Sequence, residues 1–377
     1  MTATVAAPAQ HTTHQRLLHH VRSEDAPKAD LDAIIVPHGR PATFLDQAVE
    51  AARQVDATLL LLCSKDARAT DAVLAAKQAG VSARAIDTDE VAPRGVVPRF
   101  ATTGLLGTNG LLRAADTSFK RNLGVLVAVL AGWQRVLFLD DDIALPHPED
   151  LRAAAGLLGE HAAVGLGNSG MPDNSVVCHA YRDSGGRQDT FVGGGALMVG
   201  RSSFGSFFPD IYNEDWFFLL GEDRLRCTAV TGTAHQSPYN PYDPARAASE
   251  ELGDTLAEGV YGLLDHGLGT ADATESYWAE FLESRRAFIR VAVRQVEQAP
   301  QLDRTVRSQM IEALTAALDR NVELITPALC VRYLRAWQSD RLTWQDHLRT
   351  LRARHPGGGV DGALRTLRIT TELVHRA

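Results

Sequence analysis

The run VLFLDDDIAL at residues 136–145 is an apolar segment that ends in three consecutive carboxylates, Asp140, Asp141 and Asp142. Like charges this close repel one another, so such a cluster usually holds a cation or forms a solvated turn. In an extended chain, residues two apart share a side, which predicts Asp140 and Asp142 on one side and Asp141 on the other. Two carboxylates on one side suit a hard cation such as Mg²⁺ or Mn²⁺. The alternative is a solvated acidic turn, followed by a helix that Asp150 caps.

A second pair of carboxylates, Glu214 and Asp215, lies in the segment YNEDWFF at residues 212–218. One interpretation is structural, because Asn213 can cap a helix whose first turn then carries both acids. The other is catalytic, and the two are compatible. A carboxylate beside the apolar Trp216 is expected to have a raised pKa, which suits a general base.

Basic and glycine-rich segments accompany these acids. Lys120, Arg121 and Asn122 in SFKRNLG can donate hydrogen bonds to phosphate or ribose oxygens, or form a solvated helix start. The glycines of FVGGGALMVG let the backbone approach a sugar or phosphate closely, or form a flexible turn. These glycines are Gly193, Gly194 and Gly195. Arg182 lies between the two acidic segments, where it would attract an acidic acceptor or form a surface salt bridge.

The elements that must position these residues follow an α/β pattern. Apolar strands bounded by helical spacing are predicted within 31–41, 57–64, 81–89 and from Val136, with a helix at 118–132. Strands that are apolar on both faces indicate a mostly parallel sheet covered by helices on either side. In such a sheet ligands bind beyond the carboxyl ends of the strands, where Asp140 is expected.

The chain divides by pattern into three parts. Residues 1–30 lack a continuous apolar core and are predicted to be a disordered tail rather than a signal peptide. Residues 31–245 hold the strand–helix alternation and form the predicted catalytic domain. Residues 246–377 are mostly helical, a candidate acceptor lid or homodimer interface.

Composition excludes several classes of protein. The 377 residues carry a formal net charge of -8, which argues against non-specific nucleic-acid binding. The four cysteines show no C-x-x-C spacing, so neither a disulfide framework nor a zinc site is predicted. No apolar run reaches the length of a transmembrane helix, and we expect a cytoplasmic protein.

In the order of its motifs the chain resembles the GT-A fold glycosyltransferases that use nucleotide-diphospho-sugars, with the closest likeness to family-2-type enzymes. The likeness covers about residues 31–240. It rests on VPHGRP after the first strand, SFKRNLG upstream of the D-x-D signature, FVGGGALMVGRSSF and YNEDWFF.

The resemblance implies a Rossmann-like GT-A fold and a role for each motif. Asp142, Asp140 and His235 would hold Mn²⁺ or Mg²⁺, and Asp215, with Glu214 as second candidate, would be the catalytic base. The donor, a UDP- or GDP-linked sugar, would contact Pro37, His38, Arg40, Asp66, Lys120, Arg121, Asn122, Asp140 and Asp141. A small hydroxylated acceptor would contact Gly193, Gly194, Gly195, Arg182 and Trp216.

The sequence also departs from the family pattern. The second strand ends in CSKDA, where an acidic residue and a small polar turn are common, so Asp66 is only a candidate for base recognition. There is no Q-x-x-R-W motif, which argues against a processive synthase. The hypothesis is an inverting hexosyltransferase, with retention left open. The alternatives are a nucleotidyltransferase, which PHGRPATF with its one glycine disfavours, and a non-catalytic nucleotide-sugar-binding module.

Overall fold

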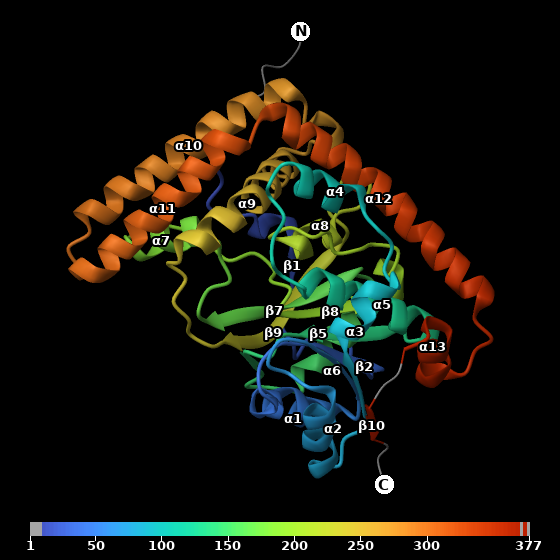
Figure 1. Cartoon of the computed structure of the whole chain (residues 1–377). Coiled ribbons are helices and arrows are strands. Elements are labelled where there is room, and N and C mark those ends of the chain that lie inside the picture. Colours follow the sequence, from blue (N-terminus) through green and yellow to red (C-terminus); the bar gives the residue numbers. More distant parts are fainter. Residues whose placement is uncertain (1–9, 370–371, 375–377) are drawn as a thin grey trace.

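A mixed sheet forms the centre of the molecule (Figure 1), and the computed structural model describes residues 10–369 and 372–374. Within these residues the strands are β1 (His19–His20), β2 (Ala33–His38), β3 (Thr58–Cys63), β4 (Ala83–Asp87), β5 (Arg135–Leu139), β6 (Ile143–Ala144), β7 (Ala163–Gly170), β8 (Ala196–Gly200), β9 (Thr228–Gln236) and β10 (Glu372–Val374). Their order in the sheet is β1-β9-β7-β8-β5-β2-β3-β4-β10, and β6 pairs with β9.

Most neighbouring strands run parallel. β2 pairs in parallel with β3 and β5, and β9 pairs in parallel with β1 and β7. β8 runs antiparallel to both β5 and β7, so those two strands point the same way. The carboxyl ends of β2, β3, β5, β7 and β9 therefore meet at one edge of the sheet, and their amino ends meet at the other.

Helices cover both faces of this sheet, as the apolar strands predict. The helices up to the Glu-Asp segment are α1 (Asp46–Val55), α2 (Ala69–Gln78), α3 (Thr88–Val91), α4 (Ala101–Thr108), α5 (Thr117–Ala131), α6 (Asp150–Leu157), α7 (Val176–Asp183) and α8 (Glu214–Leu219). Alternate residues of β2 point to opposite cores: Ile34 packs with α1, α2 and α6, whereas Ile35 packs with α5. The predicted fold class, a mostly parallel α/β sheet flanked by helices, is confirmed.

The remaining helices pack on one another and on the helices α4, α5, α7 and α8. They are α9 (Pro244–Asp265), α10 (Glu275–Gln298), α11 (Arg304–Leu324), α12 (Pro327–Arg354) and α13 (Gly359–Leu367). In Figure 1, α10 and α11 lie side by side, and α12 crosses the molecule above α5. Residues of α9 and α12 share one apolar core with β2 and β5. Among the described residues, no helix combines the length and apolar character that crossing a bilayer requires.

The N-terminal segment differs from its prediction as a disordered tail. Residues 1–9 lie outside the described residues, but the rest of the segment is folded against the domain. β1 pairs with β9, and the buried His14 contacts Glu258 at 3.1 Å and Asp265 at 2.6 Å, both on α9. The prediction failed because these partners lie more than 200 residues away in the chain.

Candidate active site

The three acids stand on a turn, not on a strand. β5 ends at Leu139, and the Ile143 amide donates to the Asp140 carbonyl at 3.2 Å, which closes the turn. The predicted split, with Asp141 facing away from its neighbours, is therefore wrong, because the two-residue alternation holds only in extended chain. Arg40 forms ion pairs of 3.0 Å with both Asp141 and Asp142.

A pocket of about 350 Å³ opens at this turn, and we call it the aspartate pocket. It is lined by Pro37, Gly39, Arg40, Lys65, Asp116, Thr117, Lys120, Asp140, Asp141 and Asp142. These residues come from the carboxyl ends of β2, β3 and β5 and from the start of α5. The pocket thus lies where an open parallel sheet binds its ligands.

Basic side chains surround the three acids. Lys120 is buried at the start of α5 and donates to the His38 carbonyl at 2.8 Å and to Ser64 Oγ at 2.7 Å. It also pairs with Asp116 at 3.1 Å. Lys120 thereby joins the ends of β2 and β3 to α5, and its charge stays at the pocket wall. His38 is buried, and its Nδ1 lies 2.9 Å from Asp141.

The aspartate pocket fits a divalent cation by the chemistry of its donors. Burial, then the nearby Asp140 and Asp141 charges, raise the pKa of Asp142, and the contact with Arg40 only partly offsets them. A bound cation would relieve this repulsion, and carboxylate oxygens are the ligands that Mg²⁺ and Mn²⁺ prefer. Arg40 has a side chain 42% exposed, so a ligand in the pocket can reach its guanidinium.

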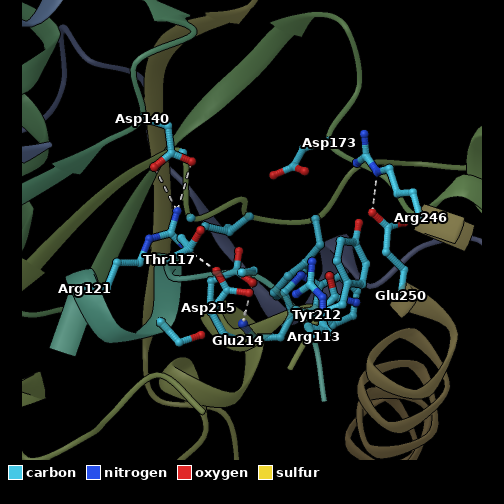
Figure 2. Close-up of a pocket in the computed structure, with 18 residues that line it drawn as sticks. Arg113, Thr117, Arg121, Asp140, Asp173, Tyr212, Glu214, Asp215, Arg246 and Glu250 are labelled. Carbon is cyan, nitrogen blue, oxygen red and sulfur yellow. Dashed lines mark hydrogen bonds and ion pairs between the residues drawn. The ribbon is translucent and has the colours of Figure 1, made fainter. Parts of the chain in front are cut away.

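A second pocket of about 350 Å³ holds the Glu-Asp segment, and we call it the Asp215 pocket (Figure 2). It shares Asp140 and Thr117 with the aspartate pocket. The buried Arg121 joins the two acidic segments: it contacts both oxygens of Asp140, at 3.0 and 3.1 Å, and Glu214 at 2.7 Å. Asp140 is therefore held at the boundary between the two pockets.

Asp215 is the acid with the most strongly altered environment in this pocket. Burial, followed by the charges of Glu214 and Asp173, raises its pKa well above the usual range, and Arg121 opposes this in part. Its Oδ1 accepts a hydrogen bond of 3.0 Å from the Trp216 amide. A buried carboxyl with a raised pKa is a stronger proton acceptor than one in water.

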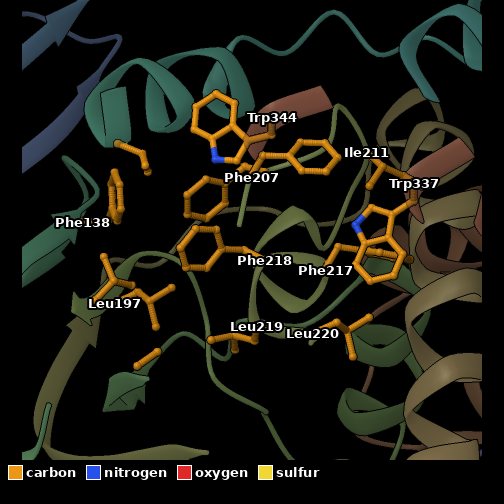
Figure 3. Packing of buried hydrophobic residues seen from close by; sticks show 14 of the residues in the cluster. Phe138, Leu197, Phe207, Ile211, Phe217, Phe218, Leu219, Leu220, Trp337 and Trp344 are labelled. Atoms are coloured by element: carbon orange, nitrogen blue, oxygen red, sulfur yellow. The ribbon is translucent and has the colours of Figure 1, made fainter. Parts of the chain in front are cut away.

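The backbone around Asp215 fixes its direction. Asn213 adopts the left-handed conformation, with a φ of 61°, and its side chain contacts Asp254 instead of capping α8. α8 is anchored by apolar packing (Figure 3): Phe218 stacks on Phe208, and Phe217 meets the edge of Trp337 on α12. This rigid packing behind the helix keeps its first turn, with both acids, against the pocket.

The far wall of the Asp215 pocket comes from α9, from the loop before α5, which carries Arg113, and from the loop before α8, which carries Tyr212. Arg246 pairs with Glu250 at 2.5 Å, and the guanidinium of Arg113 lies 5.5 Å from the centre of the Tyr212 ring. Figure 2 shows Arg246 and Glu250 across the cavity from Asp140. Arg113, Tyr212, Arg246 and Glu250 were not predicted. An arginine and a glutamate four residues apart are a common helix-surface pair, so no local signal marked them.

The glycine segment packs on charged side chains of the pocket. A Cβ on Gly193 would come within 2.0 Å of the Asp173 carboxylate, and one on Gly194 within 2.3 Å of Arg121. Gly195 accepts a hydrogen bond of 2.9 Å from the Asp140 amide. Gly194, Gly195 and Trp216 line the Asp215 pocket. The absence of side chains here leaves room for Asp173 and Arg121.

Six predicted site residues line neither pocket. Two of them lie directly behind a lining residue: His38 contacts Asp141, and Gly193 packs against Asp173. The other four lie elsewhere. Asn122 uses its amide to hold the Phe208 backbone, with bonds of 2.7 and 2.8 Å, because the helix turns it away from the acids. Asp66 is exposed, and Asp116 lines the aspartate pocket in its place. Arg182 lines a separate pocket beside β7. His235 is exposed on β9, where its Nδ1 lies 3.3 Å from Ser169 Oγ.

Comparisons with known proteins give limited similarity. No family model matches the chain, and no curated protein matches it. Among solved structures, it is similar to the mannosyltransferase PcManGT from Pyrobaculum calidifontis, determined in complex with GDP-Man and Mn²⁺. The two share 12% sequence identity and a TM-score of 0.42 over 85% of this chain and 91% of the other. Similarity at this level assigns no activity to the chain.

Proposed function

We propose that this chain is a metal-dependent, inverting glycosyltransferase that moves a hexose from a nucleotide diphosphate sugar to a hydroxyl of a small acceptor. One observation carries the proposal: an acidic and basic pocket at the carboxyl ends of the strands meets, at Asp140, a second pocket that holds the buried Asp215. The first offers the chemistry that binds a diphosphate and its cation. The second offers a base.

The donor occupies the aspartate pocket in this proposal. Arg40 and Lys65 line it and supply exposed positive charge for the diphosphate. Asp140 and Asp142 would hold Mn²⁺ or Mg²⁺, which would stabilise the charge that grows on the departing diphosphate. The sugar then extends past Asp140 toward Asp215. Asp141 contacts His38 and the Gly39 amide, so it fixes the loop after β2.

The acceptor occupies the Asp215 pocket. Its hydroxyl proton passes to the Asp215 carboxylate while its oxygen forms a bond to the anomeric carbon. The bond from that carbon to the diphosphate breaks, and the nucleoside diphosphate leaves with the electron pair. Attack from the face opposite the diphosphate gives inversion. Arg121 is a positioning residue, since it holds Asp140 and Glu214 in place.

The helical C-terminal region contributes to acceptor binding in this proposal, because α9 forms one wall of the Asp215 pocket. Arg246 and Glu250 offer hydrogen-bond donors and acceptors, and the exposed part of Trp216 offers an apolar surface on which a sugar ring can pack. A polar, hydroxylated small molecule fits this lining better than an apolar one.

A thermal-shift screen of nucleotides and nucleotide sugars, with and without Mn²⁺, tests the proposal. The expected result is a stabilisation by a nucleoside diphosphate that requires Mn²⁺ and that Asp142→Ala abolishes. Asp89→Ala, which changes an exposed acid on α3, is the matched control and should respond like the wild type. Pyrophosphate release from a nucleoside triphosphate would instead indicate a nucleotidyltransferase. Tight binding without turnover on an acceptor library would indicate a binding module.

A further inference from the structure

Three side chains with nitrogen and sulfur donors meet at the amino ends of the parallel strands. Both pockets lie at the opposite, carboxyl ends. His19 Nδ1 lies 3.1 Å from His161 Nε2 and 3.8 Å from Cys227 Sγ. All three donor atoms lie within 4.8 Å of one another. We call them the His-Cys cluster.

The topology of the sheet brings the cluster together. His161 and Cys227 each precede a strand, β7 and β9, and these strands pair in parallel. The Ala162 amide donates to the Cys227 carbonyl at 2.8 Å, which aligns the two strand starts. His19 is on β1, in register with Ala229 two residues after Cys227. The cluster therefore lies at the amino ends of the parallel strands, at the opposite edge from the Asp140 turn.

The protonation pattern of the cluster prepares it for a metal. His161 is buried, and its Nδ1 lies 3.1 Å from the Leu157 carbonyl, to which it must donate. Its Nε2 therefore presents a lone pair toward His19, and this is how a backbone carbonyl orients a ligating histidine. The two rings are perpendicular, with centres 5.3 Å apart.

Two of the three separations are close to those of a tetrahedral metal site, and the third is within 4.8 Å. With metal–nitrogen and metal–sulfur bonds of ordinary zinc length, two nitrogens lie about 3.3 Å apart and a nitrogen and a sulfur about 3.6 Å apart. The observed 3.1 and 3.8 Å differ from these by a few tenths of an ångström. Cys227 is the one exposed cysteine among the four, whereas Cys63, Cys178 and Cys330 are buried.

We propose that His19, His161 and Cys227 bind a Zn²⁺-class transition-metal ion, with water in the fourth position. The ion takes the place of the proton on His19 Nδ1, and His19 is then protonated at Nε2 instead. Cys227 releases its thiol proton to solvent and binds the ion as the thiolate. Because His19 belongs to the N-terminal segment, the ion fastens β1 to β9. The same segment reaches the second half of the molecule through the contacts of His14 with α9. The inference does not depend on the proposed transferase activity.

Titration of the metal-free, full-length protein with Co²⁺ tests this site, since a thiolate-bound Co²⁺ ion gives an intense charge-transfer band in the near ultraviolet. The expected result is one equivalent that gives the band and that Zn²⁺ displaces. Cys227→Ser should remove the band. His161→Ala removes a metal ligand, so it should weaken Co²⁺ binding by more than about 100-fold. Removing a residue that only hydrogen-bonds to a ligand costs about 10- to 100-fold.

Two further variants test whether the band arises at the His-Cys cluster and not at the neighbouring histidine of β1 or in the aspartate pocket. His20→Ala removes the neighbouring histidine of β1, which is equally exposed, and should keep the band. Asp142→Ala removes the carboxylate proposed to bind Mn²⁺ and should also keep it. A wild-type protein that gives no thiolate band, or a band that persists in Cys227→Ser, would overturn the proposal. Normal folding of Cys227→Ser is checked by its circular dichroism spectrum and its melting temperature without metal.

Discussion

The two ends of the parallel strands differ in the chemistry that they present. At the carboxyl ends, Asp140 and Asp142 offer oxygen donors, and arginines neutralise them. At the amino ends, the His-Cys cluster offers nitrogen and sulfur donors. Hard cations that bridge to phosphate prefer the first set, whereas zinc and its neighbours prefer the second. The two metal sites that we propose on this sheet would therefore select different metals by their ligand types.

The two sites also differ in how they are held. Both oxygens of Asp140 are bound by a buried arginine, and the turn after β5 is fixed by further bonds to Gly39 and Gly195. The His-Cys cluster instead joins three strand starts, one of them in the two-residue β1. The acids of the first site are thus held by several hydrogen bonds, whereas the second cluster joins the N-terminal segment to β7 and β9.

Asp215→Asn should have a large effect that is confined to the carboxyl ends of the strands. It removes the proton acceptor, so kcat should fall by about 1,000-fold, within the range that general base catalysis contributes. The KM for the nucleotide sugar and the Co²⁺ thiolate band should stay unchanged, because Asp215 belongs neither to the lining of the aspartate pocket nor to the His-Cys cluster. Steady-state kinetics with saturating acceptor measures this. A fall in donor affinity with unchanged kcat would mean that Asp215 is not the base.

His14→Gln tests how the N-terminal segment is held without a metal. Burial alone would lower the pKa of His14, but hydrogen bonds to Asp265 and Glu258 raise it to about 9. The folded-state pKa is above the unfolded value of about 6.5, so this stability is complete below that pH and is lost as the pH rises through about 9. The difference corresponds to about 3 kcal/mol.

The measurement for His14 is the free energy of unfolding by urea between pH 6 and pH 9.5, with Zn²⁺ removed by a chelator. The wild type should lose stability across this interval, while the variant should start lower and change less. His20→Ala, the exposed control on β1, should follow the wild-type curve. Parallel curves for the wild type and His14→Gln would show that the charged His14 does not fasten the segment.

Asp173→Asn should have a smaller effect, confined to pH dependence. The Asp173 charge contributes to raising the pKa of Asp215, so its removal lowers that pKa. Since the base must be deprotonated, activity falls as the pH drops through its pKa. The acidic limb of the kcat/KM profile should therefore move to lower pH in the variant. An unmoved or oppositely moved limb would contradict the assignment of that limb to Asp215.

Cys227→Ser should have the smallest effect on transfer. The cluster lies at the other edge of the sheet from Asp140, so kcat with Mn²⁺ should stay within about 2-fold of the wild type, as for a surface substitution away from the site. The increase in melting temperature that Zn²⁺ gives the wild type should be lost. A loss of transfer comparable with that of Asp215→Asn would mean that the two ends are not independent.

The features that the sequence predicts well are local. Apolar runs placed β2, β3 and β5, because strands buried on both faces are apolar at nearly every position. β4 gave a weaker pattern because the buried Arg84 interrupts it. The acids at the end of β5 and at the start of α8 were likewise found as neighbours in the chain. The acids after β5 lie at the carboxyl ends of the parallel strands because β5 pairs in parallel with β2.

The features that the sequence does not predict depend on contacts between distant segments. His19, His161 and Cys227 are far apart in the chain, so no cysteine spacing reveals their cluster. Arg246 reaches the Asp215 pocket only because α9 packs beside α8. Asn122 was assigned by its neighbours in sequence, but one residue along a helix turns a side chain by about 100 degrees, away from the direction of Arg121.

The release of nucleoside diphosphate from nucleotide sugars is the measurement that tests the central claim most directly. The assay uses the wild type, Asp142→Ala and the control Asp89→Ala, each with Mn²⁺ and with a chelator. We predict release by the wild type and the control that requires Mn²⁺ and increases with a hydroxylated acceptor, and a fall of about 1,000-fold or more in Asp142→Ala. Equal release by Asp142→Ala and the wild type with Mn²⁺ present would contradict the account.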